Sequence, residues 1–200
     1  GANVNILVMD TEVYSNTGGQ QSKATPIGAA AKFAVAGKGS PKKDLGLLAI
    51  SNGHVYVASI AFGAKDAQTL KAIQEAEAYD GPSLIIAFSH CGEHGYDLAD
   101  GLDQQALAVE TGYWPLYRFD PRRVEDGKSG LQLDSKPASR PIMDYLDHEN
   151  RFHQVKRHDP ERLAHLVAEM EKQTETRGNL YEALADLQPR HKEKDDVAAE

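Results

Sequence analysis

A loop rich in hydroxyl and amide groups follows an apolar segment near the start of the chain. The apolar segment is residues 4–9, and the loop reads Asp-Thr-Glu-Val-Tyr-Ser-Asn-Thr-Gly-Gly-Gln-Gln-Ser over residues 10–22. Open α/β sheets bind ligands at the carboxyl ends of their strands, and glycine lets the backbone approach a ligand closely. Apart from two carboxylates the loop offers neutral oxygens and N–H groups, which suit a hard cation that carries phosphates. This loop is therefore the first candidate site, for an anion or a metal.

An ordinary solvated loop is the alternative, because stretches rich in glycine, serine and asparagine often only connect elements. The segment runs as far as Pro26, however, and connections of this length are more often functional. Neither common phosphate-binding fingerprint is present, since Gly37-Lys-Gly-Ser40 has the wrong spacing for a P-loop. The residue pattern alone therefore indicates an anion or metal loop and goes no further.

The single cysteine, Cys91, is the second candidate, within the segment Ser-His-Cys-Gly-Glu-His-Gly at residues 89–95. A structural free cysteine would normally lie in an apolar run. A zinc site could use His90, Cys91 and His94, but a cluster this sparse is weak evidence for zinc. One cysteine cannot form an internal disulfide, which fits a reducing compartment.

Composition narrows the classes of function. Hydrophobic residues make up 40% of the 200 residues, which is enough for a core, and the formal net charge is −8. That charge argues against a general nucleic-acid binder or a binder of anionic membranes. The sequence has no apolar run long enough to span a membrane and no signal-peptide pattern, so we expect a soluble, cytoplasmic protein.

Three apolar segments are typical of strands, and helix-like stretches lie between and after them. The strand-like segments are residues 4–9, 55–59 and 83–88. The helix-like segments are residues 43–52, 66–79 and 102–111. This alternation predicts an α/β fold with an open, mostly parallel sheet and helices on both faces. We expect the strands at 4–9 and 83–88 to be covered on both faces, and the first loop and Cys91 to share one carboxyl edge.

The character of the chain changes after residue 120. We predict a partial α/β domain over residues 1–120, a hairpin and helical extension over 121–190, and a disordered tail over 191–200, which is charged and rich in small residues.

The extension carries its own signals of secondary structure. A strand at 116–119, just before the extension, is expected to form a hairpin with residues 131–133. Asp159, Pro160 and Glu161 predict the start of a helix, as N-cap, first helical position and early acid. Two apolar stripes at helical spacing are expected to face the core. They are Leu163, Leu166, Val167 and Met170, and then Leu180, Leu184 and Leu187.

The string Asp10-Thr-Glu-Val-Tyr-Ser-Asn-Thr-Gly-Gly-Gln20, followed by Ser22-Lys-Ala-Thr-Pro26, closely resembles the pyruvate:ferredoxin (flavodoxin) oxidoreductase family, in the C-terminal part of its thiamine-diphosphate domain. The likeness extends over about residues 3–187 and continues in four segments, Lys42–Gly46, Tyr56–Ile60, Glu75–Ile86 and Gly112–Arg118. It implies the thiamine-diphosphate-binding fold, and it favours pyruvate over 2-oxoglutarate as the substrate.

The resemblance also implies roles for individual residues of the loop. Thr11, through its side-chain oxygen, and Val13, through its carbonyl, match the positions that bind Mg²⁺ in the second half of the family's cofactor motif. In an extended segment such alternate residues project to one side. Asn16 matches the amide beside the reactive thiazolium and is the expected catalytic residue, and Gly18 and Gly19 are expected to contact the cofactor.

Cys91 matches the family's remote fourth thiolate for the [4Fe–4S] cluster nearest to thiamine diphosphate. The other cluster ligands and the Gly-Asp-Gly half of the cofactor motif do not occur in this sequence. We therefore expect the chain to be a fragment of a longer polypeptide, inactive by itself, that needs the upstream domains.

The implied enzyme oxidatively decarboxylates pyruvate with coenzyme A to acetyl-CoA and CO₂, passes electrons to ferredoxin or flavodoxin, and is a homodimer. A non-oxidative thiamine-diphosphate decarboxylase or synthase and a non-catalytic folding or interaction module are the alternatives.

Overall fold

The computed structural model describes residues 2–189, which form one five-stranded sheet with the strand order β1-β3-β2-β4-β5. The first three strands are parallel: β1 (Val4–Asp10), β2 (Tyr56–Ile60) and β3 (Pro82–Phe88). The last two run antiparallel: β4 (Tyr117–Phe119) pairs with β2, and β5 (Leu131–Leu133) pairs with β4. The predicted mostly parallel α/β sheet and the returning hairpin are both confirmed.

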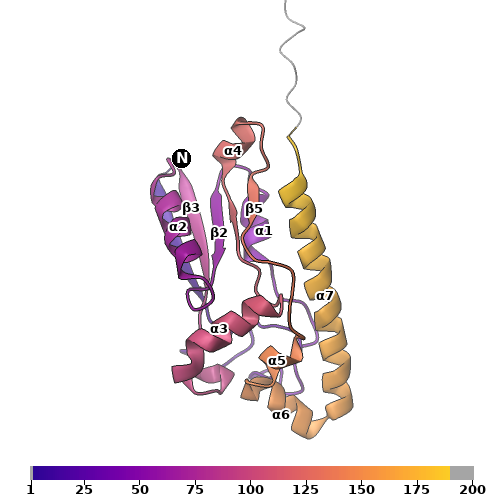
Figure 1. Cartoon of the computed structure of the whole chain (residues 1–200). Coiled ribbons are helices and arrows are strands. Elements are labelled where there is room, and N and C mark those ends of the chain that lie inside the picture. The colour runs from indigo at the N-terminus through magenta and orange to yellow at the C-terminus, as the bar shows by residue number, and fades with distance from the viewer. Residues whose placement is uncertain (1, 190–200) are drawn as a thin grey trace, which may run out of the picture.

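Helices cover opposite faces of the central strands (Figure 1). On β2, Tyr56, Ala58 and Ile60 pack against α2 (Asp66–Glu77), whereas Val57 points the other way, toward α1 (Leu45–Ile50) and α7 (Pro160–Asp186). This alternation follows from the period of two along a strand. β3 lies between β1 and β2, and its Ile85 and Ile86 are both buried, so the prediction of a strand covered on both faces holds for residues 83–88.

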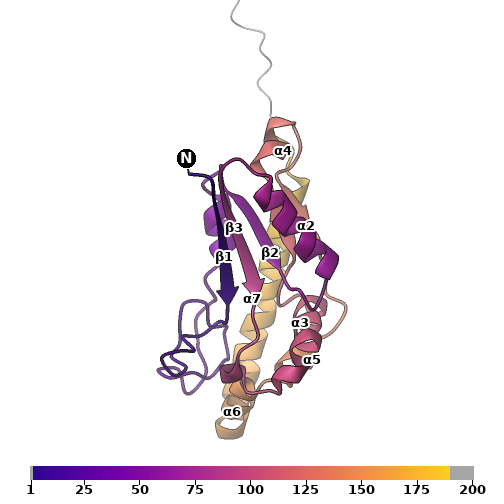
Figure 2. The same cartoon turned by 90° about the vertical axis from the view of Figure 1, so that its left-hand side faces the viewer.

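The same prediction is wrong for residues 4–9. β1 is an edge strand, and Figure 2 shows it at the open side of the sheet. Side chains on both of its faces are exposed, with Ile6 at 49% and Leu7 at 57% relative accessibility. The reason is that β3 is its neighbour on one side, and the helices of the described chain lie over β2, β3 and the hairpin. An apolar strand sequence signals burial without saying which part of a protein provides it.

The remaining helices gather at the carboxyl end of the strands and beside the hairpin. They are α3 (Gly101–Glu110), α4 (Pro121–Glu125), α5 (Met143–Leu146) and α6 (Asn150–His158), with short 3-10 turns at Gly92–His94 and Leu98–Asp100. The largest core cluster lies there and joins Phe88 at the end of β3 to Trp114, Tyr145 and Phe152. Segments before and after residue 120 thus pack into one core around the candidate loop.

α7 is one helix of 27 residues that runs along the molecule (Figure 1). It begins as predicted, since the Asp159 side chain accepts a hydrogen bond from the Arg162 N–H and Pro160 occupies the first turn. The first apolar stripe is confirmed: Leu163, Leu166 and Met170 are buried, and Val167 packs against the core cluster that contains Leu166 and Met170.

The prediction that the second stripe faces the core is wrong. Leu180 is 42% exposed, Leu187 lies beyond the helix and is 61% exposed, and Leu184 is partly buried. Tyr181 is 1% exposed and faces the core instead, where its hydroxyl donates a hydrogen bond to the Asp44 carboxylate.

Two further expectations bear on the ends of the chain and on membranes. The predicted tail at 191–200 falls outside the described residues. Across residues 2–189, no helix combines the length and apolar character needed to cross a bilayer.

Candidate functional site

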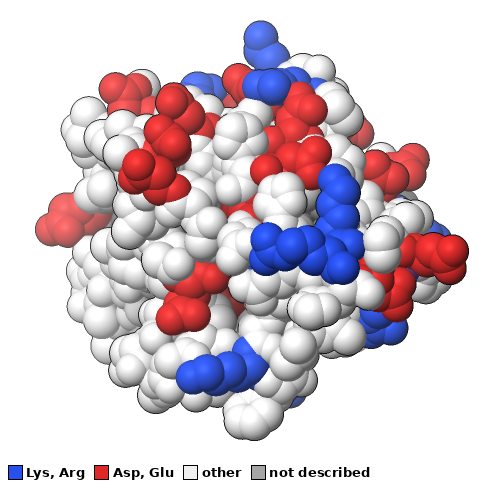
Figure 3. All heavy atoms as spheres, turned by 90° about the horizontal axis from the view of Figure 1, so that it is seen from below, with Lys and Arg blue, Asp and Glu red and all other residues white. Residues whose placement is uncertain are grey.

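The loop after β1 and the cysteine segment leave the sheet side by side. β1 and β3 pair in register from Val4 opposite Pro82 to Asp10 opposite Phe88, and the Ser89 N–H then donates to the Asp10 carbonyl at 3.1 Å. Both segments therefore begin at the same carboxyl edge, as predicted, and Figure 2 shows the first loop below the arrowhead of β1. Seen from below, this end of the molecule carries separate basic and acidic groups on a mostly uncharged surface (Figure 3).

Thr11 and Val13 bring two oxygens together. The Thr11 hydroxyl donates to the Val13 carbonyl, with 3.0 Å between the oxygens. The segment is not extended as expected, because Glu12 between them has φ +60°, in the left-handed region that residues with a side chain rarely adopt. This turn brings the two oxygens onto a common side and sends the Glu12 side chain inward.

The Glu12 carboxylate lies in the core with three donors around it. It is 1% exposed, and it accepts a hydrogen bond from the Tyr113 hydroxyl at 2.7 Å and from Arg151 Nη2 at 2.8 Å, with Lys42 Nζ at 3.2 Å. Burial alone would raise the pKa of Glu12, but Lys42, Arg151 and the other donors lower it to about 2. Burial also raises the pKa of Tyr113, which remains a donor. Glu12 is therefore an ionised carboxylate at neutral pH.

Arg151, from α6, connects Glu12 to a second buried acid. Its Nε donates to Glu149 Oε2 at 2.5 Å, and its Nη2 also reaches the Tyr145 hydroxyl at 3.1 Å. Glu149 is fully buried and accepts a further hydrogen bond from Gln104 Nε2 at 3.0 Å. A guanidinium is the side chain best suited to bridge two carboxylates, because its donors form a rigid fork.

His94 holds the other side of the loop. It is fully buried, and its Nε2 lies 2.8 Å from the Thr11 carbonyl, while its Nδ1 lies 3.9 Å from Glu149 Oε1. A carbonyl only accepts, so Nε2 carries the proton in this contact. Burial lowers the pKa of His94, which favours the neutral ring. The backbone of Thr11 is thus fixed by a side chain from the cysteine segment.

The tip of the loop depends on its glycines. Gly18 and Gly19 have φ +100° and +84°, and their N–H groups donate to the Ser15 and Tyr14 carbonyls. A Cβ on Gly19 would lie 2.3 Å from Glu93 Oε2. Both glycine N–H groups are therefore used within the loop, and the glycines shape it. Asn16 lies exposed at the tip.

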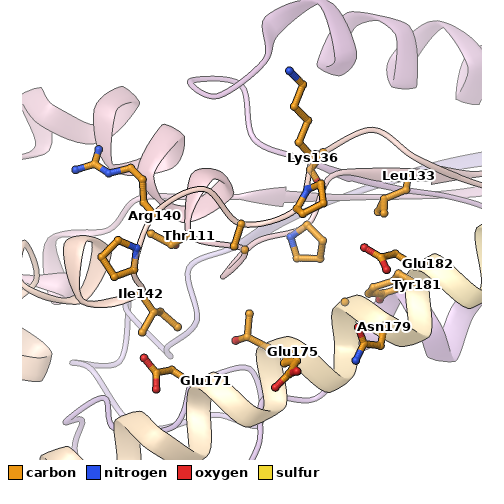
Figure 4. Close-up of a pocket in the computed structure, with 18 residues that line it drawn as sticks. Thr111, Leu133, Lys136, Arg140, Ile142, Glu171, Glu175, Asn179, Tyr181 and Glu182 are labelled. Atoms are coloured by element: carbon orange, nitrogen blue, oxygen red, sulfur yellow. The ribbon is translucent and has the colours of Figure 1, made fainter.

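A cavity of about 250 Å³ lies beside the loop, lined by Val13, Gly18 and Gly19 together with Lys32 and Arg151. A separate cavity of about 410 Å³ lies between α7 and residues 135–142 (Figure 4). None of the site residues predicted from the sequence lines that second cavity, so it belongs to a different part of the surface.

Cys91 is partly buried and extended, directly before the turn Gly92–His94. Within residues 2–189, no group of three or more histidine, cysteine, aspartate and glutamate side chains is arranged to hold a metal ion. His94 is occupied by the Thr11 carbonyl, and His90 faces Gln105 at 3.4 Å. The zinc alternative therefore has no complete ligand set in the described part of the chain.

The sequence reasoning missed the residues that support the loop. They are Glu12, Tyr113, Glu149 and Arg151, with His94 considered only as a zinc ligand. A charged residue between two candidate ligands was the available signal for Glu12. Arg151 gave no local signal, since its partner Glu12 lies 139 residues away in the sequence.

Comparisons with known proteins agree with the resemblance in the loop. Residues 1–87 match the family described as thiamine pyrophosphate enzyme, C-terminal TPP binding domain. The chain is 65% identical over 185 residues to the pyruvate-flavodoxin oxidoreductase of Rhodospirillum rubrum, which covers 92% of this chain and 15% of that protein. It is 50% identical over 186 residues to the pyruvate:ferredoxin oxidoreductase of Moorella thermoacetica, covering 93% of this chain and 16% of that protein. It is also 46% identical over 186 residues to the mitochondrial pyruvate dehydrogenase [NADP(+)] of Euglena gracilis, and this match covers 92% of this chain and 10% of that protein.

Proposed function

Because this chain belongs to the thiamine pyrophosphate enzyme family, in the group of the pyruvate-flavodoxin and pyruvate:ferredoxin oxidoreductases, we propose that it provides the cofactor loop of an enzyme that oxidatively decarboxylates pyruvate with coenzyme A. The chain spans 15% of the length of the Rhodospirillum relative, so the reaction is proposed for a longer protein that contains it. The observation that carries the proposal is the pair of oxygens of Thr11 and Val13, 3.0 Å apart within the matched residues.

The spacing of this oxygen pair fits Mg²⁺. Octahedral Mg²⁺ binds oxygens at about 2.1 Å, so two adjacent ligands lie about 3 Å apart. The hydroxyl that now donates to the Val13 carbonyl would turn its lone pair to the ion. Thr11 and Val13 are neutral, so the positive charge would be balanced by the diphosphate and by a carboxylate from outside this chain.

Thiamine diphosphate, when bound, supplies the electron sink for loss of CO₂ from a 2-oxo acid. The residues of this chain would hold and orient it. Asn16 lies exposed at the loop tip and is proposed to contact the reactive ring. Gly18 and Gly19 keep the tip in a shape that a side chain would disturb.

Cys91 is proposed as one thiolate ligand of a [4Fe–4S] cluster that takes the electrons onward. It leaves the sheet at the same edge as the Thr11 loop, and the chain contains no second cysteine, so the other ligands would come from elsewhere in the protein. The names of the relatives suggest ferredoxin or flavodoxin as the carrier and pyruvate as the substrate. Acetyl-CoA and CO₂ as products, a homodimer and a cytoplasmic location complete the proposal.

Thr11→Val tests the proposal in the full-length protein. The change removes one oxygen ligand and keeps the shape of the side chain, so thiamine-diphosphate affinity should fall and should become less responsive to Mg²⁺. Isothermal titration calorimetry at several Mg²⁺ concentrations measures both. Ser22→Ala, at the far end of the same loop, is the control and should leave the affinity unchanged. Equal affinity of parent and Thr11→Val at every Mg²⁺ concentration would contradict the proposed ligand role.

A further inference from the structure

We propose that Arg151 and Glu149 on one side of Glu12, and His94 on the other side, are positioning residues that hold the Thr11 and Val13 oxygens in place for a cation before any cofactor binds. The inference rests on the proposed function and deepens it, because it assigns to the C-terminal part of this chain a role in the site. We call Glu12, Lys42, Glu149 and Arg151 the buried charge cluster.

The backbone at Glu12 is in a conformation that needs support. A non-glycine residue with positive φ costs roughly 1–2 kcal/mol and persists where its surroundings fix it. Two hydrogen bonds fix the backbone itself: the Glu12 N–H donates to Asp10 Oδ1 at 2.9 Å, and the Thr25 hydroxyl donates to the Glu12 carbonyl at 2.6 Å. They hold the ends of the turn but leave the inward direction of the side chain to be set by its partners.

The buried charge cluster sets that direction. Lys42, Tyr113 and Arg151 approach the Glu12 carboxylate from three separate segments of the chain. An outward swing of Glu12 would break all three contacts and leave the guanidinium with only Glu149 and the Tyr145 hydroxyl among its side-chain partners in the described chain. The turn that places the Thr11 and Val13 oxygens side by side is therefore tied to the position of Arg151.

The opposite side of the turn is fixed by the same group of residues. His94 Nε2 holds the Thr11 carbonyl at 2.8 Å, and its Nδ1, which has no hydrogen-bond partner among the described residues, lies 3.9 Å from Glu149. Glu149 thus lies between Arg151 and His94. The residue that holds the Glu12 side chain and the residue that holds the Thr11 carbonyl therefore both lie next to this one carboxylate, in the segment before α6.

Stability alone gives a weak reason for such a cluster. Removing charges from water costs several kcal/mol per ion, and apolar residues of equal volume often stabilise a core as well or better. What the cluster adds is a defined geometry, and functional groups need support from residues whose own positions are locked. The chain offers a comparison: Arg118 on β4 is buried and pairs with Glu75 at 2.6 Å and Asp134 at 2.8 Å, with contacts to strands and helices away from the loop.

Arg151→Met and Arg118→Met, each in the full-length protein, form a matched pair. Both remove a buried guanidinium between two acids. Loss of a residue that orients metal ligands typically lowers affinity 10- to 100-fold, so Arg151→Met should weaken Mg²⁺-dependent thiamine-diphosphate binding by roughly that factor, and Arg118→Met should change it less than about twofold. Calorimetry measures the affinity.

Hydrogen exchange without cofactor provides the second readout. Amides of residues 11–20 should exchange faster in Arg151→Met than in the parent, whereas Arg118→Met should loosen β4 and leave the loop protected. If Arg151→Met does not fold, Glu12→Gln serves instead, since it keeps the shape and removes the charge that Arg151 holds, and the same two changes are expected.

Unchanged affinity together with unchanged loop exchange in a folded Arg151→Met or Glu12→Gln protein would overturn the positioning role. Equal loosening of the loop by Arg118→Met would overturn it too, because the effect would then be general. If the parent protein does not bind thiamine diphosphate, the proposed function fails, and the exchange experiment alone still decides whether the cluster holds the loop.

Discussion

Tyr181→Phe should destabilise the chain much more than the loss of one hydroxyl group at the surface would. Tyr181 is 1% exposed, and its hydroxyl donates to Asp44 Oδ2 at 2.7 Å and lies 3.3 Å from the Tyr117 hydroxyl. The contact joins α7 to the residue that caps α1, across 137 positions of sequence. Burial raises the pKa of Tyr181, which therefore remains a donor throughout the ordinary pH range.

The magnitude follows from the type of hydrogen bond. A bond to a charged acceptor contributes about 1.5–3 kcal/mol, and phenylalanine keeps the packing of the ring against Tyr117, whose centroid lies 4.6 Å away. We therefore expect a loss of about 2 kcal/mol in the free energy of unfolding, which corresponds to a fall in Tm of roughly 4–8 °C for a chain of this size.

Urea denaturation of the 200-residue chain, followed by the fluorescence of its single tryptophan, measures this loss. Trp114 is 4% exposed and reports opening of the core. Leu180→Ala is the control: Leu180 is 42% exposed, so its truncation should cost less than about 0.5 kcal/mol. Asp44→Asn combined with Tyr181→Phe completes a double-mutant cycle, with an expected coupling of at least about 0.5 kcal/mol. A Tyr181→Phe protein as stable as the parent, or a Leu180→Ala protein that is less stable than Tyr181→Phe, would refute the assignment of the buried face of α7.

Two further predictions concern Cys91 and Asp120. Cys91→Ala in the full-length protein should lower the iron content by one cluster and stop reduction of the carrier, while thiamine diphosphate still binds, because Thr11 and Val13 are unchanged; normal iron content and full carrier reduction would exclude the cluster role. Burial alone would raise the pKa of Asp120, but hydrogen bonds from Arg122 hold it below its ordinary value. Its contribution to stability is therefore present above about pH 4 and is lost as the pH falls through the lower folded-state pKa. Asp120→Asn keeps the helix cap and should reduce the free energy of unfolding at pH 7 by no more than about 1 kcal/mol, because Arg122 is 43% exposed. The variant should also show a weaker dependence of stability on pH below 4. Denaturation at pH 7 and below pH 4 checks this, and parent-like acid sensitivity of the variant would contradict it.

The sequence predicted those parts of the fold that leave a local pattern. Apolar runs located the three parallel strands, and Asp159 followed by Pro160 located the start of α7, because capping and strand periodicity depend on neighbours in sequence. The second stripe on α7 failed for a related reason. The spacing of the leucines favoured Leu180 as a core residue. Tyr181 faces the core instead, where its hydroxyl donates to Asp44, a residue distant in the sequence.

The candidate site divides in the same way. The loop and the edge of the sheet that carries it follow from the order of strand and polar residues. The left-handed turn at Glu12 does not, since glutamate has no preference for positive φ and the guanidinium that pairs with its side chain lies 139 positions away in the sequence. The exposure of β1 could not be predicted either, because the apolar residues of a strand do not reveal whether it lies at the edge or in the centre of its sheet.

The pairing of Glu12 with Arg151 has a consequence for synthesis on the ribosome. The two residues lie 139 positions apart, and translation proceeds at about 5–20 residues per second. Glu12 therefore leaves the ribosome roughly 7–28 seconds before Arg151 does. During that interval the carboxylate lacks Arg151, the guanidinium with which it pairs in the core, so we expect Glu12 to stay hydrated and its turn to stay open. β1, β2 and β3 can already pair in that time, whereas the turn at Glu12 takes its final form only after Arg151 has emerged.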